Sequence, residues 1–326
     1  FSALTALLYY SSSISQALLS NTIDDLIKQN IGIKATGGWR PDMNFTKEQF
    51  REIISFNLNV GLPMESQPYR IDNEAIKWTN YTDARHDEYS GIWNGNGNLS
   101  VLLLGNSFAM RAAPLFYDIF KDRYSIFRVY THLGIRLLTD DDWPKFRSAY
   151  RVLLENMRPD ITLVLARDEN YLSSTPIQLR EITEKRIEEI KQFSRRVVVD
   201  GQNTFCGPFL KLKSGEDMST PEVIVRKLQK GRLDIGELHW PRNMSDSYHA
   251  LETSILSSIA KKNRNITFNN IYEQFCLKNE AVCPFYNPNN IHSYYGDKWG
   301  HLVSEGLSTL RIEYERIVTR LIEELS

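Results

Sequence analysis

The fold is decided by Val101-Leu102-Leu103-Leu104-Gly105-Asn106-Ser107-Phe108, a short apolar run that ends in Gly-Asn-Ser. The run has the length and composition of a buried strand, and the residues that follow, Ala109 to Ala113, favour a helix. A strand-to-helix turn at the carboxyl edge of a parallel sheet holds a side chain beside the free N–H groups of the helix. This stretch therefore predicts an α/β fold in which Ser107 lies at the edge of the sheet.

Apolar runs alternate with helical patterns along the rest of the chain. We expect strands at 99–104, 124–130, 161–166, 196–199 and 266–268, and helices at 108–120, 144–157, 176–193 and 302–324. This alternation is typical of a parallel sheet that is covered by helices. The sequence thus predicts a three-layer α/β/α domain with a central parallel sheet of about five strands.

Two segments lack this alternation. Residues 1–95 carry little strand pattern, although Thr46 to Arg51 can begin a short helix, and residues 200–247 are rich in Gly, Pro and charged residues. We interpret residues 1–95 as an extension, residues 96–326 as the domain, and residues 200–247 as a loop insertion over the sheet edge.

Composition and charge limit the partners that this chain is expected to have. The chain has 326 residues, 42% hydrophobic and 24% charged, with a net charge of -1. Such a balance predicts no electrostatic attraction to nucleic acid. No apolar run reaches the roughly 18 residues that span a bilayer. Because the chain begins with Phe1, we expect it to be a piece of a longer protein, and the lack of a span here does not exclude membrane spans in the other part.

Cysteines and sequons bear on the compartment. The six residues between Cys276 and Cys283 suit a small disulfide loop, which leaves Cys206 as a buried thiol or as the partner of a cysteine elsewhere in the parent. Five Asn-x-Ser/Thr sequons begin at Asn44, Asn80, Asn98, Asn243 and Asn265. Together these features favour a luminal or extracellular setting.

A second motif precedes the last predicted helix. It reads Tyr294-Tyr295-Gly296-Asp297-Lys298-Trp299-Gly300-His301. His301 is suited to act as a general base because imidazole titrates near neutral pH, and Asp297 is suited to orient the ring. With Ser107 these residues supply a nucleophile, a carboxylate and a base in the chain order Ser, Asp, His. His292 and His132 are the alternative bases.

This arrangement resembles the SGNH hydrolase and acyltransferase superfamily. Its motif Gly-Asp-Ser is usually Gly-Asn-Ser in the acyltransferase branch, as in Gly105-Asn106-Ser107. The usual Asp-x-x-His is longer by one residue here, and a turn of helix can absorb that residue because positions three and four apart share a face. The resemblance covers residues 98–325 and implies a flavodoxin-like SGNH fold with Ser107, Asp297 and His301 as catalytic residues.

The resemblance also implies an oxyanion hole. In this superfamily its donors are the serine N–H, a Gly after the second strand and a polar residue after the third, which correspond to Ser107, Gly134 and Asn170. The hydrolases carry Gly-x-Asn-Asp at the third place, whereas Arg167-Asp168-Glu169-Asn170 stands here, a departure that fits the acyltransferase branch. The sequence has neither a dinucleotide fingerprint nor a zinc pattern, so we expect no metal and no cofactor in this domain.

Similar domains lie C-terminal to the membrane helices of acyltransferase-3 type proteins. The resemblance therefore implies a multi-pass membrane parent, an extracytoplasmic position, the membrane acyltransferase-3 domain as partner, and acyl-CoA as the acyl source for that membrane half. We expect Ser107 to transfer an acyl group, commonly acetyl, to a hydroxyl of a glycan or another acceptor. Two alternatives stay open: a secreted SGNH esterase with water as acceptor, and a catalytically silent binding ectodomain.

Overall fold

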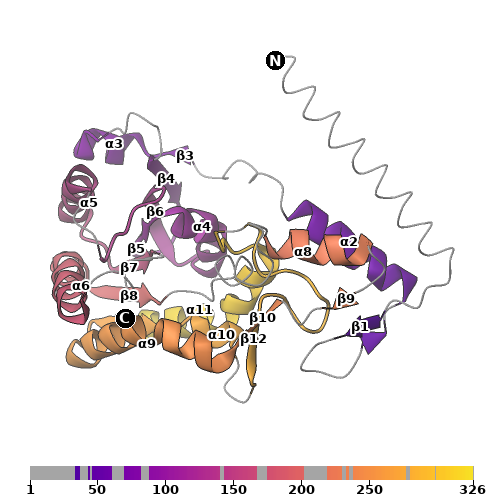
Figure 1. Cartoon of the computed structure of the whole chain (residues 1–326). Helices are drawn as coiled ribbons and strands as arrows, with labels where there is room; N and C mark the ends of the chain where they lie inside the picture. The colour runs from indigo at the N-terminus through magenta and orange to yellow at the C-terminus, as the bar shows by residue number, and fades with distance from the viewer. Residues whose placement is uncertain are drawn as a thin grey trace.

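A seven-stranded sheet lies at the centre of the computed structural model (Figure 1). The structure describes residues 34–36, 43–44, 46–60, 70–81, 88–139, 143–166, 175–201, 219–229, 233–234, 238–276, 280–297 and 299–325. The strand order is β11-β8-β7-β5-β6-β4-β3, with bounds Ile266–Asn269, Arg196–Asp200, Ile161–Leu165, Leu99–Gly105, Tyr124–His132, Glu88–Asn94 and Arg70–Ile71. The five strands from β11 to β6 are parallel. When these five strands are numbered by their order along the chain and read across the sheet from β6 to β11, they run 2-1-3-4-5. This is the flavodoxin-like order, which confirms the predicted fold class.

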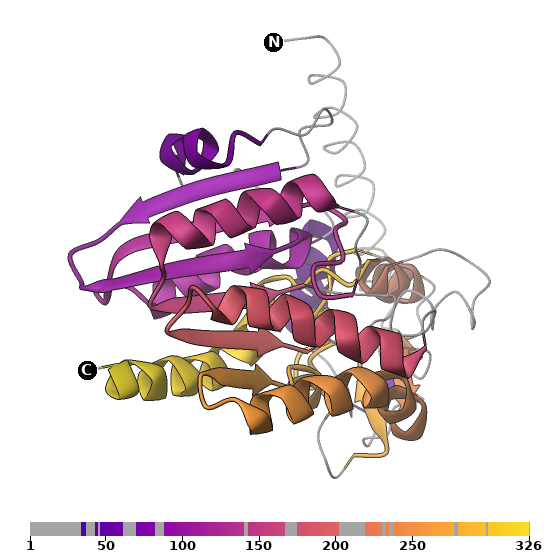
Figure 2. The ribbon, with the colours of Figure 1, turned by 90° about the vertical axis from the view of Figure 1, so that its left-hand side faces the viewer.

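Helices cover both faces of the sheet, as Figure 2 shows from the side of α5 and α6. Val101 and Leu103 of β5 face a core shared with α2, α4, α8, α10 and α11, whose bounds are Lys47–Asn59, Ser107–Ile119, Thr220–Gln229, Tyr272–Phe275 and Ser304–Leu325. Leu102 and Leu104 face a second core shared with α3, α5, α6 and α9, at Asn73–Thr79, Pro144–Met157, Pro176–Lys191 and Arg242–Lys262. Burial on both faces explains why β5 is a continuous apolar run.

The sheet is wider than the sequence analysis expected. The strands β4 and β3 extend it on one side, and both are antiparallel to their neighbours. Both precede residue 96, so the expected boundary between 95 and 96 falls inside the sheet, between β4 and β5. The sequence of β4 hides its period because Ile92 and Trp93 are adjacent apolar residues, which breaks the alternation typical of a strand with one covered face.

The insertion at 200–247 is not made of loops alone, in contrast to the prediction. It includes α8, the strands β9 (Leu233–Asp234) and β10 (His239–Pro241), and the start of α9. Val223 and Ile224 of α8 are buried in the core that also contains Phe50 and Ile53 of α2. The two small sheets are β2-β1-β9, with β1 at Lys34–Thr36 and β2 at Met43–Asn44, and β10-β12, with β12 at Val282–Pro284. Residues of the N-terminal extension and of the insertion therefore fold together.

Several helix ends follow general capping rules. Thr46 and Gln49 form a capping box at the start of α2, where a short helix was expected. Pro144 occupies the first turn of α5, and Arg158 ends that helix in the left-handed conformation. Local sequence thus accounts for these helix boundaries.

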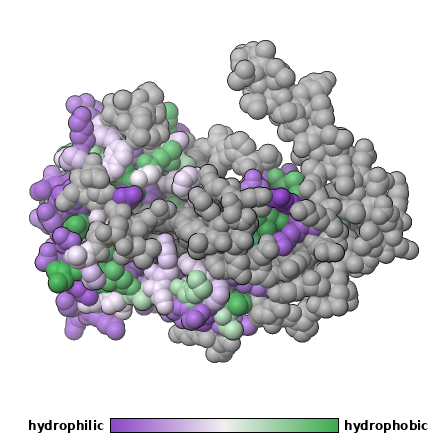
Figure 3. Space-filling model, in the orientation of Figure 1, coloured by the Kyte–Doolittle hydropathy of each residue, from purple (hydrophilic) through white to green (hydrophobic). Residues whose placement is uncertain are grey.

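The described surface is mixed in character. Over α5 and α6 hydrophilic residues predominate, with single apolar residues among them, and a group of apolar atoms lies where α2 and α8 meet (Figure 3). Among the described helices, none combines the length and the apolar character that crossing a bilayer requires.

Candidate active site

Ser107 is the first residue of α4, directly after β5 and one residue of turn. The turn is tight because a Cβ on Gly105 would lie 1.8 Å from the backbone oxygen of Leu165 in β7. Only glycine allows the two strands to approach so closely. Asn106 follows, and its N–H donates to the same Leu165 oxygen at 3.3 Å. The end of β5 is therefore fixed against β7 immediately before the serine.

Asn106 joins the start of α4 to the loop after β6. Its Oδ1 accepts the Phe108 N–H at 3.1 Å as an N-cap, and its Nδ2 donates to the Ile135 carbonyl at 3.0 Å. The N–H of Ser107 stands at the first helical position, where amides have no acceptor within the helix. This amide and the positive end of the helix favour negative charge beside Ser107. The sequence analysis quoted Asn106 only as part of the motif; its cap could have been expected from its N-cap position.

His301 and Asp297 meet Ser107 in one hydrogen-bonded chain. His301 Nε2 lies 2.7 Å from Ser107 Oγ, and His301 Nδ1 lies 2.6 Å from Asp297 Oδ2. The neutral ring would carry its proton on Nδ1, facing the carboxylate, and leave Nε2 to accept from the serine. The three predicted residues are brought together, and this is the geometry by which a nucleophile, a base and an orienting carboxylate are recognised.

The extra residue between Asp297 and His301 is absorbed by a turn. Asp297 Oδ1 accepts the backbone N–H groups of Trp299 and His301 at 3.0 and 3.2 Å. Gly300 adopts φ +77°, a conformation that glycine enters without steric penalty. The carboxylate thus holds the backbone of the turn with one oxygen and the imidazole with the other.

Arg111 completes the charge distribution. It lies one helical turn after Ser107 on α4, and its Nη2 is 3.4 Å from Asp297 Oδ2. Burial alone would raise the pKa of Asp297, but its bonds to His301 and the charge of Arg111 hold that pKa below its ordinary value. Burial lowers the pKa of Arg111, and Asp297 opposes that shift. The sequence analysis missed Arg111, although its i+4 spacing from Ser107 puts it on the same helix face.

The other histidines lie elsewhere. The ring of Phe108 stacks on His301 with centroids 4.6 Å apart, which fixes the plane of that imidazole. His132 is buried at the end of β6, with Nδ1 2.9 Å from the Leu133 carbonyl. His292 stacks on Phe56 at 3.9 Å. Of the three histidines His132, His292 and His301, it is His301 that is hydrogen-bonded to Ser107.

The predicted oxyanion donors are placed in part. Gly134 is exposed in the turn after β6, with φ +71° and open space around the position of a Cβ. The adjacent Ile135 carbonyl accepts from Asn106, so the turn is tied to the start of α4. Asn170 lies outside the described residues. The roles of Gly134 and Asn170 as donors stay predictions.

A largely apolar cavity lies between α4, α11 and the carboxyl ends of β7 and β8. It is open to solvent, and its wall includes Phe108, Ala112, Leu165, Ala166, Leu302 and Leu310. Two wall residues neighbour the chain of hydrogen bonds directly, since Phe108 follows Ser107 and Leu302 follows His301. An apolar cleft beside reactive polar groups is the usual form of a small-molecule site.

The floor of this cavity holds a buried carboxyl group. Asp200, the last residue of β8, accepts hydrogen bonds from Asn269 Nδ2 at 3.0 Å and from the hydroxyl of Tyr314 on α11. Burial raises the pKa of Asp200 to about 7, against the lowering effect of these two bonds. The sequence analysis gave Asp200 no role, because only tertiary packing reveals its burial.

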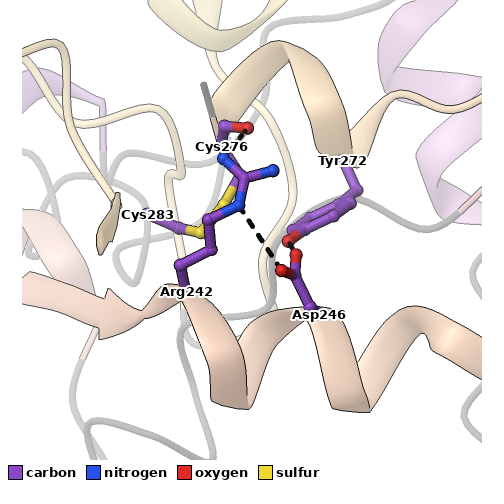
Figure 4. The surroundings of a disulfide bond; sticks show 5 residues. All are labelled: Arg242, Asp246, Tyr272, Cys276 and Cys283. Atoms are coloured by element: carbon purple, nitrogen blue, oxygen red, sulfur yellow. Dashed lines mark hydrogen bonds and ion pairs between the residues drawn. A yellow bond between two sulfur atoms is a disulfide. The ribbon is translucent and has the colours of Figure 1, made fainter. Parts of the chain in front are cut away.

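The cysteine pair is bonded, as Figure 4 shows. The Cys276–Cys283 disulfide closes its loop beside α9, where Arg242 Nη1 donates to the Cys276 carbonyl at 3.0 Å. Arg242 Nε lies 3.4 Å from Asp246 Oδ2, and the hydroxyl of Tyr272 donates to Asp246 (Figure 4). The loop is therefore closed by the disulfide and attached to α9 by the Arg242–Cys276 hydrogen bond, while Tyr272 of α10 is attached to α9 through Asp246.

Most of the sequons lie on the surface. Four of the asparagines are exposed, namely Asn80, Asn98, Asn243 and Asn265. Asn44 lies in β2, and Cys206 falls outside the described residues. Glycosylation of these asparagines stays a prediction.

Comparison with known proteins finds one matching family and several similar solved structures. The sequence model of one family, described as an SGNH domain fused to AT3 domains, matches residues 77–316. Among solved structures, the chain is similar to a candidate acylhydrolase from Bacteroides fragilis, at 15% identity and a TM-score of 0.44, over 70% of this chain and 90% of that one. It is also similar to a GDSL-like lipase from Bacteroides thetaiotaomicron, at 15% identity and a TM-score of 0.40, over 68% and 87% of the two chains. A search of curated proteins gave no significant match.

Proposed function

The chain belongs to the family of SGNH domains that are fused to AT3 domains, and we propose that Ser107 passes an acyl group to a hydroxyl acceptor. The observation that carries this proposal is the chain of hydrogen bonds from Ser107 Oγ through His301 to Asp297, at 2.7 and 2.6 Å. The apolar cavity beside it supports an acyl group as the substrate.

The proposed reaction has two halves. His301 Nε2 takes the proton of Ser107 Oγ as this oxygen attacks the acyl carbonyl, and the protonated ring then gives that proton to the departing group of the donor. The acyl-enzyme ester is attacked by an acceptor hydroxyl, whose proton passes to His301 and finally returns to Ser107 Oγ. Asp297 holds the ring and balances its charge in both halves. The N–H groups of Ser107 and Gly134 are the proposed oxyanion donors, and loss of one such donor typically raises the barrier by about 3 kcal/mol.

The fusion described for the family supports a membrane parent. We propose that the domain stands on the extracytoplasmic side, receives its acyl group from the membrane AT3 domain of that parent, and uses a glycan hydroxyl as acceptor. The disulfide supports this compartment because such bonds persist in oxidising surroundings. Acyl-CoA is the proposed source for the membrane half, and the domain itself needs no cofactor in this scheme.

The first experiment is intact-mass analysis after exposure to a fluorophosphonate. We expect one adduct on the wild-type chain, mapped to Ser107, and none on Ser107→Ala or His301→Ala, since attack needs both the hydroxyl and its base. His249→Ala, at a buried histidine of α9, serves as the matched histidine control and should label like wild type. A folded wild-type chain that gains no adduct would contradict the proposal and favour the silent ectodomain.

A second experiment separates the transferase from the esterase. A chromogenic acetyl ester is hydrolysed in the presence of increasing alcohol or oligosaccharide, and the acylated acceptor is quantified by mass spectrometry. A transferase should divert most of the acetyl group from water to the acceptor. Acetate as the sole product at saturating acceptor would favour the esterase.

A further inference from the structure

We propose that α2 is part of the active site, with Asn57 as the residue that positions the loop carrying Asp297 and His301. The inference rests on the proposed function, because positioning matters only if His301 serves Ser107. The helix spans Lys47–Asn59 and therefore lies outside the family match at residues 77–316. The role proposed for α2 therefore rests on its contacts with the loop and not on the family match.

The Asn57 side chain forms hydrogen bonds to the two loop residues on either side of His292. Its side chain is 2% exposed, and its Nδ2 donates to the Ile291 carbonyl at 3.0 Å. Its Oδ1 accepts the Ser293 N–H at 3.1 Å. The amide thereby satisfies two buried backbone groups as a neighbouring strand would, which fixes both the position and the direction of the loop.

The loop at this point has an unusual backbone. Ile291 adopts φ +57°, a region that β-branched residues rarely enter. Such a conformation persists only where the surroundings determine it, and these positions cluster at functional sites. Here the Ile291 carbonyl is held by Asn57, its N–H donates to the Asn287 carbonyl at 2.8 Å, and its side chain is fully buried.

A short path leads from this anchor to His301. Ser293 Oγ donates to the Tyr295 carbonyl at 2.6 Å and accepts the Tyr295 N–H at 3.1 Å. The next residue, Gly296, donates its N–H to the His301 carbonyl at 2.9 Å. The end of α2 also touches this point, because a Cβ on Gly296 would lie 2.9 Å from the Val60 oxygen. Displacement of the anchor would therefore shift the turn that holds the imidazole.

A second contact links α2 to the helix after His301. The ring of His292 stacks on Phe56 of α2, with centroids 3.9 Å apart and planes 6° from parallel. Its Nδ1 lies 3.4 Å from Glu305 Oε2, in the first turn of α11. The loop that carries Asp297 and His301 is thus tied to α2 before the turn and, through His292, to α11 after it.

The test compares Asn57→Ala with Asn59→Ala in the full chain. Asn59 is an exposed residue of the same helix, so the second variant makes the same chemical change without touching the loop. Three quantities are measured: the rate constant of fluorophosphonate labelling, kcat and KM on a chromogenic acetyl ester, and the low-field proton resonance of the His301–Asp297 hydrogen bond. Circular dichroism establishes that each variant is folded.

We expect Asn57→Ala to lower labelling and kcat about 10- to 100-fold with little change in KM, because small misplacement of a catalytic group has effects of this size. The low-field resonance should shift or broaden, and Asn59→Ala should match wild type in every measurement. A folded Asn57→Ala chain with wild-type labelling and a wild-type resonance would overturn the proposal.

A milder variant guards against failure to fold. Phe56→Leu removes the stacking on His292 and leaves Asn57 in place, so we expect a smaller loss of labelling with a shifted resonance. If Asn57→Ala does not fold, wild-type values for Phe56→Leu would overturn the proposal. If the wild-type chain itself is not labelled, the proposed function fails, whereas the resonance still reports whether α2 positions the His301–Asp297 pair.

Discussion

The two halves of the candidate site are built in different ways. Ser107 is positioned by the backbone. Its Cα is fixed by the pairing of β5 with β7, by the close approach of Gly105 to β7, and by the first turn of α4. Asp297 and His301 lie on a stretch without regular structure, which side chains such as Asn57 and Arg111 hold in position. The position of Ser107 is therefore a property of the fold, and that of His301 depends on a few contacts.

This difference predicts that substitutions in one half mainly lower stability and that substitutions in the other mainly lower the reaction rate. A larger side chain at the β5–β7 contact before Ser107 should destabilise the domain, whereas changes around His301 should leave a folded domain with a slow reaction. The following variants test that contrast, from the largest expected effect to the smallest.

Asp297→Asn should lower kcat by about 10³- to 10⁴-fold, because an amide does not hold the proton on Nδ1 or balance the charge of the protonated ring. The thermal midpoint should change little. Asp122→Asn, at an exposed turn residue, is the matched control and should behave like wild type in both kinetics and melting. Retention of a tenth of the wild-type kcat by Asp297→Asn would show that this carboxylate does not orient the base.

Gly105→Ala should destabilise the domain by about 3 kcal/mol or more, since overpacking against a backbone oxygen cannot be relieved by a rotamer change. Urea unfolding measures the loss. Gly134→Ala is the comparison: its Cβ would meet open space, so it should lose only about 1 kcal/mol from the positive φ. Equal losses in the two variants would contradict the claim that strand packing fixes the nucleophile.

Asp200→Asn should change how stability depends on pH. The pKa of Asp200 is raised to about 7 in the folded chain, so the folded state keeps a proton that the unfolded state releases above its ordinary pKa of 3.8. Its contribution is therefore fully present below that ordinary value and is lost as the pH rises toward 7. Relative to wild type, the variant should gain up to about 4 kcal/mol between pH 4 and pH 8. Urea midpoints across this range measure the gain, and parallel stability curves would contradict it.

Arg111→Gln should have the smallest effect, a fall of only a few-fold in kcat/KM, because the Arg111–Asp297 pair is partly exposed and solvent screens it. Arg111 helps to hold the pKa of Asp297 low, so its removal should raise that pKa and move the acid limb of the pH–rate profile to higher pH. Arg311→Gln, which alters an exposed ion pair with Asp118, is the control. An unchanged acid limb would mean that Arg111 does not act on the pair.

The sequence predicted the parts of the site that local pattern determines. The parallel strands are apolar because they are buried on both faces, and a serine at the end of such a strand is readable as a turn. The contact between Asn57 and Ile291 was not predictable, because the two residues are 234 positions apart and nothing local marks an asparagine as a partner of a distant carbonyl. The strand β4 was not predicted for a related reason. It forms because it pairs with β6, although its own sequence pattern is irregular.

A parallel sheet has two unlike edges, and two of the exposed sequon asparagines lie at one of them. Asn98 and Asn265 directly precede β5 and β11, so they stand on the rim where the parallel strands begin, while Ser107 stands on the rim where they end. Carbohydrate carried at these two positions would cover the back of the molecule and leave its reactive side bare. The same two positions are therefore natural handles for tethering the domain to a support with its reactive side facing outward.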